Sequence, residues 1–214
     1  PSPPPSPPAP PLPPAPPFLP PSPPPNRCLD LVRPGADFSS CLHLRFADLR
    51  AAQLAKAKLD HADASHARLD DADLDEATLH YTDLTRASLD RASLFKADLL
   101  GATLVGASLY RADLTESNLE AALLDGADLQ ASTLRRTKLH EASARGANFS
   151  RALLHGASFY NADLGGAYFA GADLREVDFS RAIIHKADFT GVRHAEDAIF
   201  DLAVGKPAAG PKAL

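Results

Sequence analysis

A five-residue repeat runs through residues 44–191 and limits this chain to very few folds. An apolar residue, large in all cases but Ala64 and Ala144, stands at every fifth place from Leu44 to Phe189; we call this position i, and alanine usually stands two residues before it. Five residues advance about 500° around an α-helix, so a helix would scatter these side chains over its whole surface. A continuous strand would send successive members of an odd period to opposite faces. Neither regular element can bury them together.

A chain that turns after each short extended segment can bury the apolar residues of every repeat. Positions i−2 and i of an extended tripeptide point the same way, and the two remaining residues are free to form a turn. We therefore expect alanine and leucine inside the coil, with positions i−1, i+1 and i+2 facing water. Because the chain has no Trp or Met, Leu, Ala and Phe must fill the core. The prediction is a solenoid with one continuous core.

Three longer periods predict how many repeats make one coil. Glycine recurs at position i+2 of every fourth repeat, at Gly106, Gly126, Gly146 and Gly166, where we expect a turn with positive φ. Charge alternates at the same spacing, at Lys56, Glu76, Lys96, Glu116 and Arg136. Phenylalanine recurs at every second repeat, at Phe149, Phe159, Phe169, Phe179 and Phe189. All three patterns indicate four repeats per coil, and a coil spacing of about 4.8 Å then predicts a rod of about 35 Å with about seven coils.

The repeat Ala112-Asp113-Leu114-Thr115-Glu116 and its neighbours follow the pattern A(D/N)LXX. In this pattern the chain resembles the pentapeptide-repeat proteins. The resemblance implies an all-β fold, a right-handed quadrilateral β-helix solenoid with positions i and i−2 stacked inside. The handedness is implied by the resemblance alone.

The pattern divides the chain into five segments. Residues 1–26 form a Pro-rich arm of the polyproline type, 27–43 an N-terminal cap, 44–191 the β-helix, 192–204 a short C-terminal capping helix, and 205–214 a tail. Caps are expected because both ends of a stacked coil leave unpaired edges. The helix is predicted from the helical spacing of five apolar residues: Ala195, Ala198, Ile199, Leu202 and Ala203.

The segment 1–25 is dominated by proline, with 17 prolines. Proline fixes φ and removes the N–H donor, which excludes helix and sheet and favours an extended polyproline II conformation. Two interpretations are open. The segment is either a stiff spacer or a docking arm, in which Phe18 and Leu19 would be the apolar anchor.

Two cysteines, Cys28 and Cys41, lie in the predicted N-terminal cap. A disulfide between them would stabilise a segment with little core of its own and would imply an oxidising compartment. Two reduced, partly buried thiols are the alternative. Cys41 and His43 could begin a metal site, but no second ligand pair has matching spacing, so we expect no metal.

Nothing in the sequence predicts an enzyme. No nucleophile elbow, phosphate loop or zinc motif occurs, and the eight histidines are scattered over outer positions of different coils. Most aspartates stand at i−1, where we expect them to accept hydrogen bonds from turn amides. A filled rod offers no pocket to shift the pKa of a catalytic pair. We therefore expect no catalytic residues and no cofactor.

Two surface features are candidates for binding. An apolar girdle occupies the outward position i+1 of four successive repeats and is predicted to contact a partner or the arm; it consists of Phe95, Leu100, Val105 and Tyr110. An acidic collar lies within residues 60–90. It consists of Asp60, Asp63, Asp70, Asp71, Asp73, Asp75 and Glu76. The collar is either a solvated surface or a means of steering a basic partner.

The leading hypothesis is a non-enzymatic interaction or structural scaffold, an accessory subunit that binds protein partners through the rod and the arm. The formal net charge of −5 does not favour nucleic acid. No apolar stretch is long enough to span a bilayer. Peripheral association with a membrane complex is compatible with this sequence. Relatives in the family include cyanobacterial and plastid proteins, which favours a plastid, with its thylakoid lumen as one site, after removal of a targeting segment; the bacterial cytoplasm or secretion is the alternative.

Two alternative functions are also considered. One branch of the family mimics DNA and modulates type II topoisomerases. The mild net charge and the basic cluster Arg135, Arg136 and Lys138 argue against that function here. A secreted or wall-associated structural module is the other alternative, since Pro-rich segments occur in such proteins.

Overall fold

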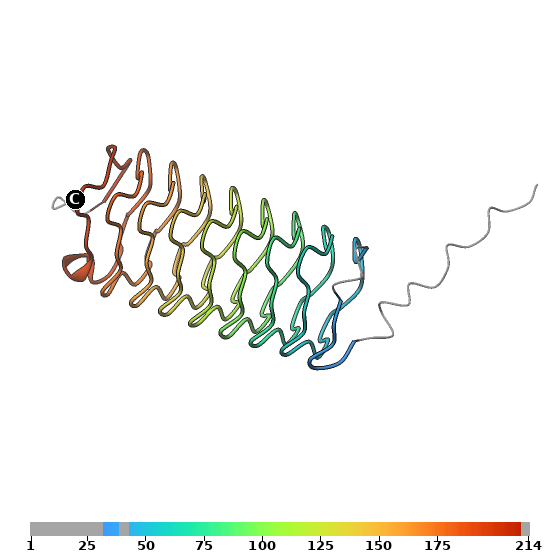
Figure 1. The fold of residues 1–214 in the computed structure, drawn as a ribbon. Helices are drawn as coiled ribbons and strands as arrows, with labels where there is room; N and C mark the ends of the chain where they lie inside the picture. Colours follow the sequence, from blue (N-terminus) through green and yellow to red (C-terminus); the bar gives the residue numbers. More distant parts are fainter. Residues whose placement is uncertain (1–31, 39–42, 211–214) are drawn as a thin grey trace, which may run out of the picture.

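In the computed structural model the described residues, 32–38 and 43–210, form a rod of stacked coils (Figure 1). Isolated parallel bridges occur at every fifth residue and join each coil to the next. His43 pairs with Asp63, and Asp63 pairs in turn with Asp83. Each of these bridges joins residues that stand four repeats apart, so one coil consists of four repeats. The bridges occur at position i−1, one residue before the large apolar residue.

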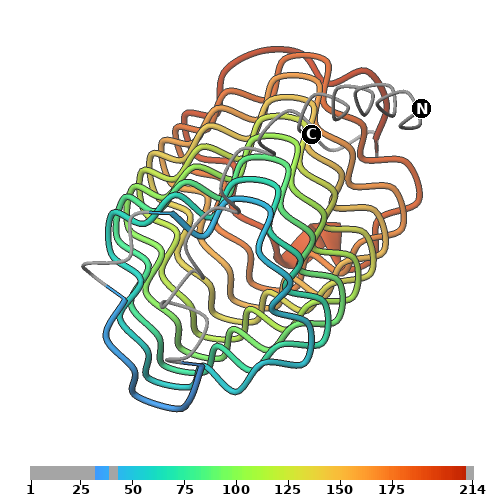
Figure 2. The same ribbon diagram turned by 90° about the vertical axis from the view of Figure 1, so that its right-hand side faces the viewer.

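Each coil contributes one bridge to each of four columns, which we name sides A to D. Side A contains His43, side B Asp48, side C Gln53 and side D Lys58, and each continues at every fourth repeat. The connection from side A to side B is named the A–B turn, and the other turns follow the same convention. Seen along the rod, the coils lie one behind another with their sides in register (Figure 2).

The backbone hydrogen bonds follow one plan in every repeat. The N–H of position i donates to the next coil, as Leu84 does to Thr103 O at 2.7 Å, and so does position i+2, as Arg86 does to Val105 O at 3.0 Å. The N–H of the following residue closes the turn, as Ala87 donates to Leu84 O at 2.9 Å. From Ala64 to Leu174 only the N–H of position i+1 lacks a backbone acceptor. That group must find a side chain or water.

Position i+2 has a positive φ, between +53° and +70°, in every repeat from Phe46 to Gly191. Gly106 and the glycines that follow it at every fourth repeat share this conformation, which confirms the turn predicted from their spacing. The sequence did not reveal that non-glycine residues adopt the same conformation. Tyr81, for example, has φ +55°. Such residues carry a steric cost of about 1–2 kcal/mol that glycine avoids.

Leucine and alanine fill the interior as expected, and phenylalanine forms two ladders near the C-terminal end. Phe169 stacks between Phe149 and Phe189, with centroid distances of 5.0 and 4.9 Å and nearly parallel rings. All three side chains are fully buried. A second ladder on side D consists of Phe159, Phe179 and Phe200. The spacing of every second repeat therefore marks two stacks, as predicted.

The predicted capping helix over 192–204 is wrong. The one helix among the described residues is η2, a 3-10 helix at Ala195–Asp197, and no helix there is long and apolar enough to cross a bilayer. After η2 the coil resumes with a shift of one residue, because Asp178 pairs with Ile199 and not with Ala198. Val204 and Ala209 continue the ladder, so most of the predicted tail belongs to the rod.

The misassignment has a simple cause. Three more repeats follow η2, each with alanine at i−2: Ala198-Ile199-Phe200, Ala203-Val204-Gly205 and Ala208-Ala209-Gly210. Their apolar residues also fit helical spacing, and the single inserted residue hides the five-residue register. Once the phase is shifted, backbone bonds to the previous coil, such as Ile199 N to Val177 O at 2.9 Å, favour the coil over a helix.

A similar shift occurs at the N-terminal end. Asp37 pairs with Lys58, again one residue out of the common register, and Phe38 is fully buried in the core. Residues 36–38 therefore extend the stack on side D and are not a separate cap. Residues 1–31, 39–42 and 211–214 lie outside the described ranges.

Candidate functional site

The aspartates at position i−1 serve the turns. The carboxylate of Asp113 accepts the Thr115 N–H at 2.9 Å, and that of Asp188 accepts the Thr190 N–H at 2.8 Å. The donor is the i+1 amide, the backbone N–H for which the interior coils provide no backbone acceptor. The expectation that these carboxylates satisfy turn amides is confirmed, and it explains why Asp or Asn recurs at this position.

Several acids of the collar do the same work from the previous coil. Asp60, at position i+1, accepts the His80 N–H and the Thr78 hydroxyl, both at 2.9 Å. Asp75 likewise accepts the Phe95 N–H at 3.1 Å and the Ser93 hydroxyl. In both cases the residue at i−1 is Ser or Thr, which leaves the i+1 amide without its usual carboxylate. The acid in the preceding coil replaces it.

The remaining acids of the collar also have partners within the rod. Asp63 and Asp73 accept hydrogen bonds in their own turns, and Asp70 accepts the Ser88 hydroxyl. Asp71 Oδ2 is 2.7 Å from Arg91 Nη2, and Glu76 Oε2 is 3.6 Å from Lys56 Nζ. The hydroxyl and N–H of Ser65 hold the pKa of Asp63 below its usual value. These contacts favour a structural role for the collar.

The apolar girdle does not form one surface. Phe95 lies in the C–D turn, Leu100 in the D–A turn, Val105 in the A–B turn and Tyr110 in the B–C turn, so the four side chains are spread over all four turns of the coil. Only Val105 is exposed, at 37%, and the other three are half-buried. Cations also lie beside the two rings: Lys96 Nζ is 5.0 Å from the Phe95 centroid.

A larger apolar surface lies at the C-terminal end, where the sequence predicted a helix. We call it the C-terminal apolar patch; its members are Ile183, Ile199, Leu202 and Val204, which are 43%, 47%, 73% and 60% exposed. Ile183 and Val204 are bridged to each other on side A. Ile199 lies on side D, and Leu202 lies in the turn between these sides. Five-residue spacing with a one-residue shift was the signal that could have revealed it.

The last coil also leaves its interior open. Phe200 occupies a core position and stacks on Phe179 at 4.9 Å, yet it is only half-buried. A hollow of about 260 Å³ opens beside it, lined by Ile184, Phe200, Ala203, Gly205, Lys206 and Pro207. The hollow adjoins the C-terminal apolar patch through Val204 and its neighbours.

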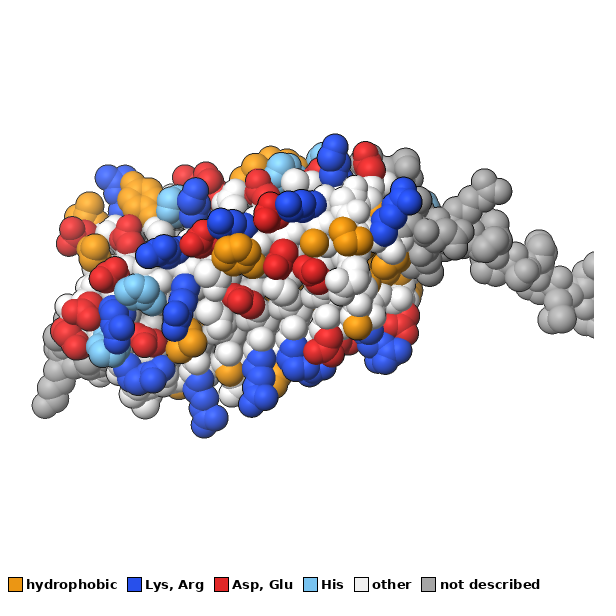
Figure 3. Space-filling model, turned by 90° about the horizontal axis from the view of Figure 1, so that it is seen from below, with side chains coloured by type: hydrophobic (Ala, Val, Ile, Leu, Met, Phe, Trp, Pro, Cys, Tyr) orange, Lys and Arg blue, Asp and Glu red, His pale blue; other side chains and the backbone are white. Residues whose placement is uncertain are grey.

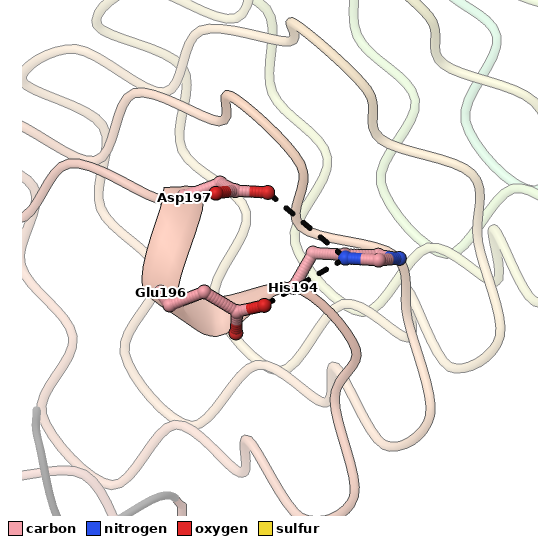
Figure 4. Close-up of side chains that lie close together, drawn as sticks. All are labelled: His194, Glu196 and Asp197. Atoms are coloured by element: carbon pink, nitrogen blue, oxygen red, sulfur yellow. Dashed lines mark ion pairs between the residues drawn. The ribbon is translucent and has the colours of Figure 1, made fainter.

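One histidine lies close to two acids at η2 (Figure 4). His194 Nδ1 is 3.8 Å from Glu196 Oε1 and 3.9 Å from Asp197 Oδ2, while Arg175 Nη2 lies 2.9 Å from His194 Nε2. Because a guanidinium can only donate, this contact assigns the proton of the neutral imidazole to Nδ1, facing the carboxylates. A proton on Nδ1 and the nearby guanidinium oppose a cation there. The group is a polar cluster in which His194 lies between a guanidinium and two carboxylates.

Charged and hydrophobic side chains are mixed on the sides of the described rod. On the face in Figure 3, acidic and basic side chains are interspersed and hydrophobic side chains are scattered among them. The anchor residues Phe18 and Leu19 and the cysteines Cys28 and Cys41 lie outside the described residues. Of the nine large hydrophobic residues that are exposed in the described ranges, four belong to the C-terminal apolar patch.

Comparison with protein families gives one match, to pentapeptide repeats, in eight copies. The matched segments are residues 35–80, 72–109, 112–151, 132–169 and 157–193. They cover most of the rod and begin before residue 44, in agreement with the early start of the bridges. A search of curated protein sequences gave no significant match.

Solved structures of pentapeptide repeat proteins resemble the chain. QnrB1, a plasmid-mediated fluoroquinolone resistance protein, is 14% identical over 81% of this chain and 91% of its own, with a TM-score of 0.50. HetL from the cyanobacterium Nostoc is 26% identical over 78% and 91%, with a TM-score of 0.31. A thylakoid-lumen protein from Arabidopsis thaliana is 30% identical over 58% and 66%, with a TM-score of 0.22. The likeness to QnrB1 concerns the fold alone.

Proposed function

Because this chain belongs to the pentapeptide repeat family, we propose that it is a non-enzymatic scaffold, an accessory subunit that binds a protein partner through the surface of its rod. The proposed form of the rod is the right-handed quadrilateral β-helix of that family. Two structural features support a binding role over a catalytic one. The interior is filled with apolar side chains, and the aspartates are engaged in turn hydrogen bonds.

The C-terminal apolar patch carries the proposal. Leu202, at 73%, is the most exposed large hydrophobic residue of the described chain, and it adopts φ +57°. Non-glycine residues adopt this conformation at the turn position throughout the rod, so the exposure of Leu202 and not its φ sets it apart. Contiguous exposed apolar side chains at the end of a rod are typical of a protein interface. A partner would bury Ile199, Leu202 and Val204 together with the open coil beside Phe200.

Affinity purification of the tagged full chain, followed by mass spectrometry, tests the proposal. The variant Ile199→Ser/Leu202→Ser should lose the specific partner while its thermal unfolding stays close to that of the parent. The matched control is Leu123→Ser, which removes a side chain of 45% exposure on side A away from the patch and should retain the partner. Equal recovery of all proteins by the parent and the patch variant would contradict the proposal.

The DNA-mimic alternative is less well supported. A mimic of DNA needs carboxylates that are free to face a basic surface, whereas all seven acids of the collar have partners within the rod. A gyrase supercoiling assay tests this alternative directly, and we expect no inhibition by the purified chain.

A plastid location, in the thylakoid lumen, remains our proposal for the compartment. It rests on the Pro-rich arm and on the two cysteines that stand close together in the N-terminal segment. Measurement of free thiols in the protein isolated from its native source tests it, because a lumenal protein should have Cys28 and Cys41 oxidised. Localisation of a tagged full-length precursor would provide the independent check.

A further inference from the structure

Side A is flanked by two exposed aromatic stacks at the N-terminal end of the rod. In the A–B turn, Phe46 stacks on His66 with a centroid distance of 4.9 Å. In the D–A turn, His61 stacks on Tyr81 at 5.5 Å, with the rings almost parallel. Phe46 and Tyr81 are 64% and 59% exposed. We name these four residues the aromatic face. The histidines were expected on scattered outer positions, and the 20-residue spacing of each pair was the signal for the two stacks.

The four residues stand where the backbone disfavours them. All occupy position i+2, with φ between +55° and +61°, a conformation that costs a bulky residue about 1–2 kcal/mol compared with glycine. Further along the A–B column the same position is glycine, from Gly106 to Gly166. Most repeats carry a non-glycine residue at this position, so the positive φ alone does not mark a site. These residues differ from the other turn residues in that their rings stack in pairs and that Phe46 and Tyr81 remain largely exposed.

The surroundings hold the rings in place. The Tyr81 ring lies on Gly101, where a Cβ atom would be only 2.5 Å from Tyr81 Cε1. Arg45 lies 5.0 Å from the centroid of the Phe46 ring. On side A between the two stacks, Asp63 accepts the Ser65 N–H at 3.0 Å. Rings that are fixed in advance lose little side-chain entropy when a ligand binds.

We propose that the aromatic face binds the chain's own Pro-rich segment, residues 1–25. Proline-rich segments dock on exposed aromatic rings because the polyproline II helix is already extended and presents flat apolar rings. The segment has 17 prolines, so it cannot pair as a strand with the open edge at the other end of the rod. It contains no acidic residue that Asp63 and its neighbours would repel.

The path of the chain makes this contact accessible. Gly35 N–H donates to Ala55 O at 2.6 Å, so the described chain enters the rod at the C–D turn. From there the D–A turn with His61 and Tyr81 is one side away. Residues 1–31 would span about 95 Å at about 3.1 Å per residue, far more than this distance. Covalent attachment also provides a high effective concentration, in the millimolar range for a short flexible link.

Photo-crosslinking in the full chain tests the proposal. A p-benzoylphenylalanine at position 81 replaces one ring by a photoreactive ring, and its crosslinks are mapped by mass spectrometry. The matched control carries the same residue at Ala51, which is exposed in the B–C turn and also lies one side away from the C–D turn. We expect crosslinks to residues 1–25 at least fivefold more often from position 81 than from position 51.

Two further results decide between occupants. Adding Phe46→Ser to the position-81 protein should lower the yield of these crosslinks several-fold, because half of the aromatic face is lost. Equal yields from positions 81 and 51 would overturn the proposal, since an arm that moves freely reaches both. Crosslinks found only in covalent dimers would also overturn it, because the occupant would then be the arm of a second copy.

Discussion

The first and last coils of the rod use the same turn for different purposes. At the N-terminal end position i+2 of the A–B turn holds Phe46 and His66, whereas from Gly106 to Gly166 the same column is glycine, and all have positive φ. The cores differ as well. Leucine fills the N-terminal coils, while phenylalanine ladders fill the C-terminal ones. The same backbone plan therefore accommodates different residues in the A–B turn and core side chains of different size at the two ends of the rod.

The difference indicates that residues at some turns are kept for their exposed side chains and not for stability. In the N-terminal coils strained turn residues project rings into solvent. The C-terminal coils have unstrained glycines in the A–B turn and dense stacked rings inside, yet their last coil leaves Phe200 half-exposed beside the apolar patch. Each end thus has its own exposed apolar surface. The lateral surface at the N-terminal end fits a Pro-rich segment, and the terminal surface fits a protein partner.

The largest effect is expected inside the phenylalanine ladders. Phe169→Ala should lower the free energy of unfolding by about 3–5 kcal/mol, because it leaves a cavity between two stacked rings. Phe200→Ala should cost less than half as much, since its side chain is only half-buried. Urea unfolding followed by circular dichroism measures both. Equal costs would show that the last coil is as closed as the interior.

The next effect concerns glycines at the C-terminal end. Gly205→Ala should destabilise by about 2–3 kcal/mol, because the added Cβ would lie 2.9 Å from His185 backbone atoms and φ is +101°. Gly126→Ala should cost only about 1 kcal/mol, the cost of positive φ alone, since nothing lies within 4 Å of its Cβ. Thermal unfolding of both variants provides the comparison. A Gly126→Ala cost as large as that of Gly205→Ala would contradict the steric argument.

Much of this fold was predictable because the repeat carries its own register. Alanine at i−2, leucine at i and glycine at every fourth repeat predicted the interior, the turns and the coil length. The positive φ of Tyr81 also follows from this register, because Tyr81 shares position i+2 with the glycines, but it was expected only for glycine. The aromatic stacks join residues 20 residues apart, one predicted coil, although the sequence does not show that their rings stack and stay exposed.

The C-terminal patch was missed for a different reason. A single inserted residue at η2 moves Ile199 and Val204 out of the five-residue frame, and their new spacing also fits a helix. Hydrogen bonds to the preceding coil decide the structure there, and these are tertiary contacts. The acidic collar, in contrast, was correctly predicted to lie on the surface, but its structural role was not predicted. Asp60 and Asp75 accept hydrogen bonds from backbone amides of the next coil, and such contacts are not visible in the sequence.

A smaller effect, of opposite sign, is expected in the N-terminal turns. Phe46→Gly removes a bulky residue at φ +58° and loses only an exposed stack, so the free energy of unfolding should stay level or rise by up to about 1 kcal/mol. Ala131→Gly, at a turn residue with φ +59°, is the matched control, and its free energy of unfolding should rise by a similar amount. A clear loss of stability in Phe46→Gly alone would show that the ring supports the fold and is not retained for binding.

The smallest effect is a difference in acid sensitivity between the two halves. Among the described residues, four carboxyl groups have a lowered pKa, and all lie before residue 100: Asp48, Asp63, Asp71 and Asp98. The Arg50 side-chain hydrogen bond lowers the pKa of Asp48 to about 2. At Asp98 burial raises the pKa, but hydrogen bonds from His80 and Asn118 outweigh it. A lowered pKa in the folded state stabilises it above the unfolded value of about 4, and this contribution is lost as the pH falls toward the folded value.

Lowering the pH from 5 to 2.5 should therefore reduce amide protection in residues 44–100 before it does so in residues 120–190. An ordinary imidazole is already protonated throughout this range, so the change reports the carboxyl groups. Hydrogen exchange followed by mass spectrometry measures it. Asp63→Ser/Asp98→Asn should be less protected at pH 5 and should respond less to acid in the N-terminal half, because its hydrogen-bonded carboxylates are gone. Simultaneous loss of protection in both halves would show that the acid response does not depend on these four groups.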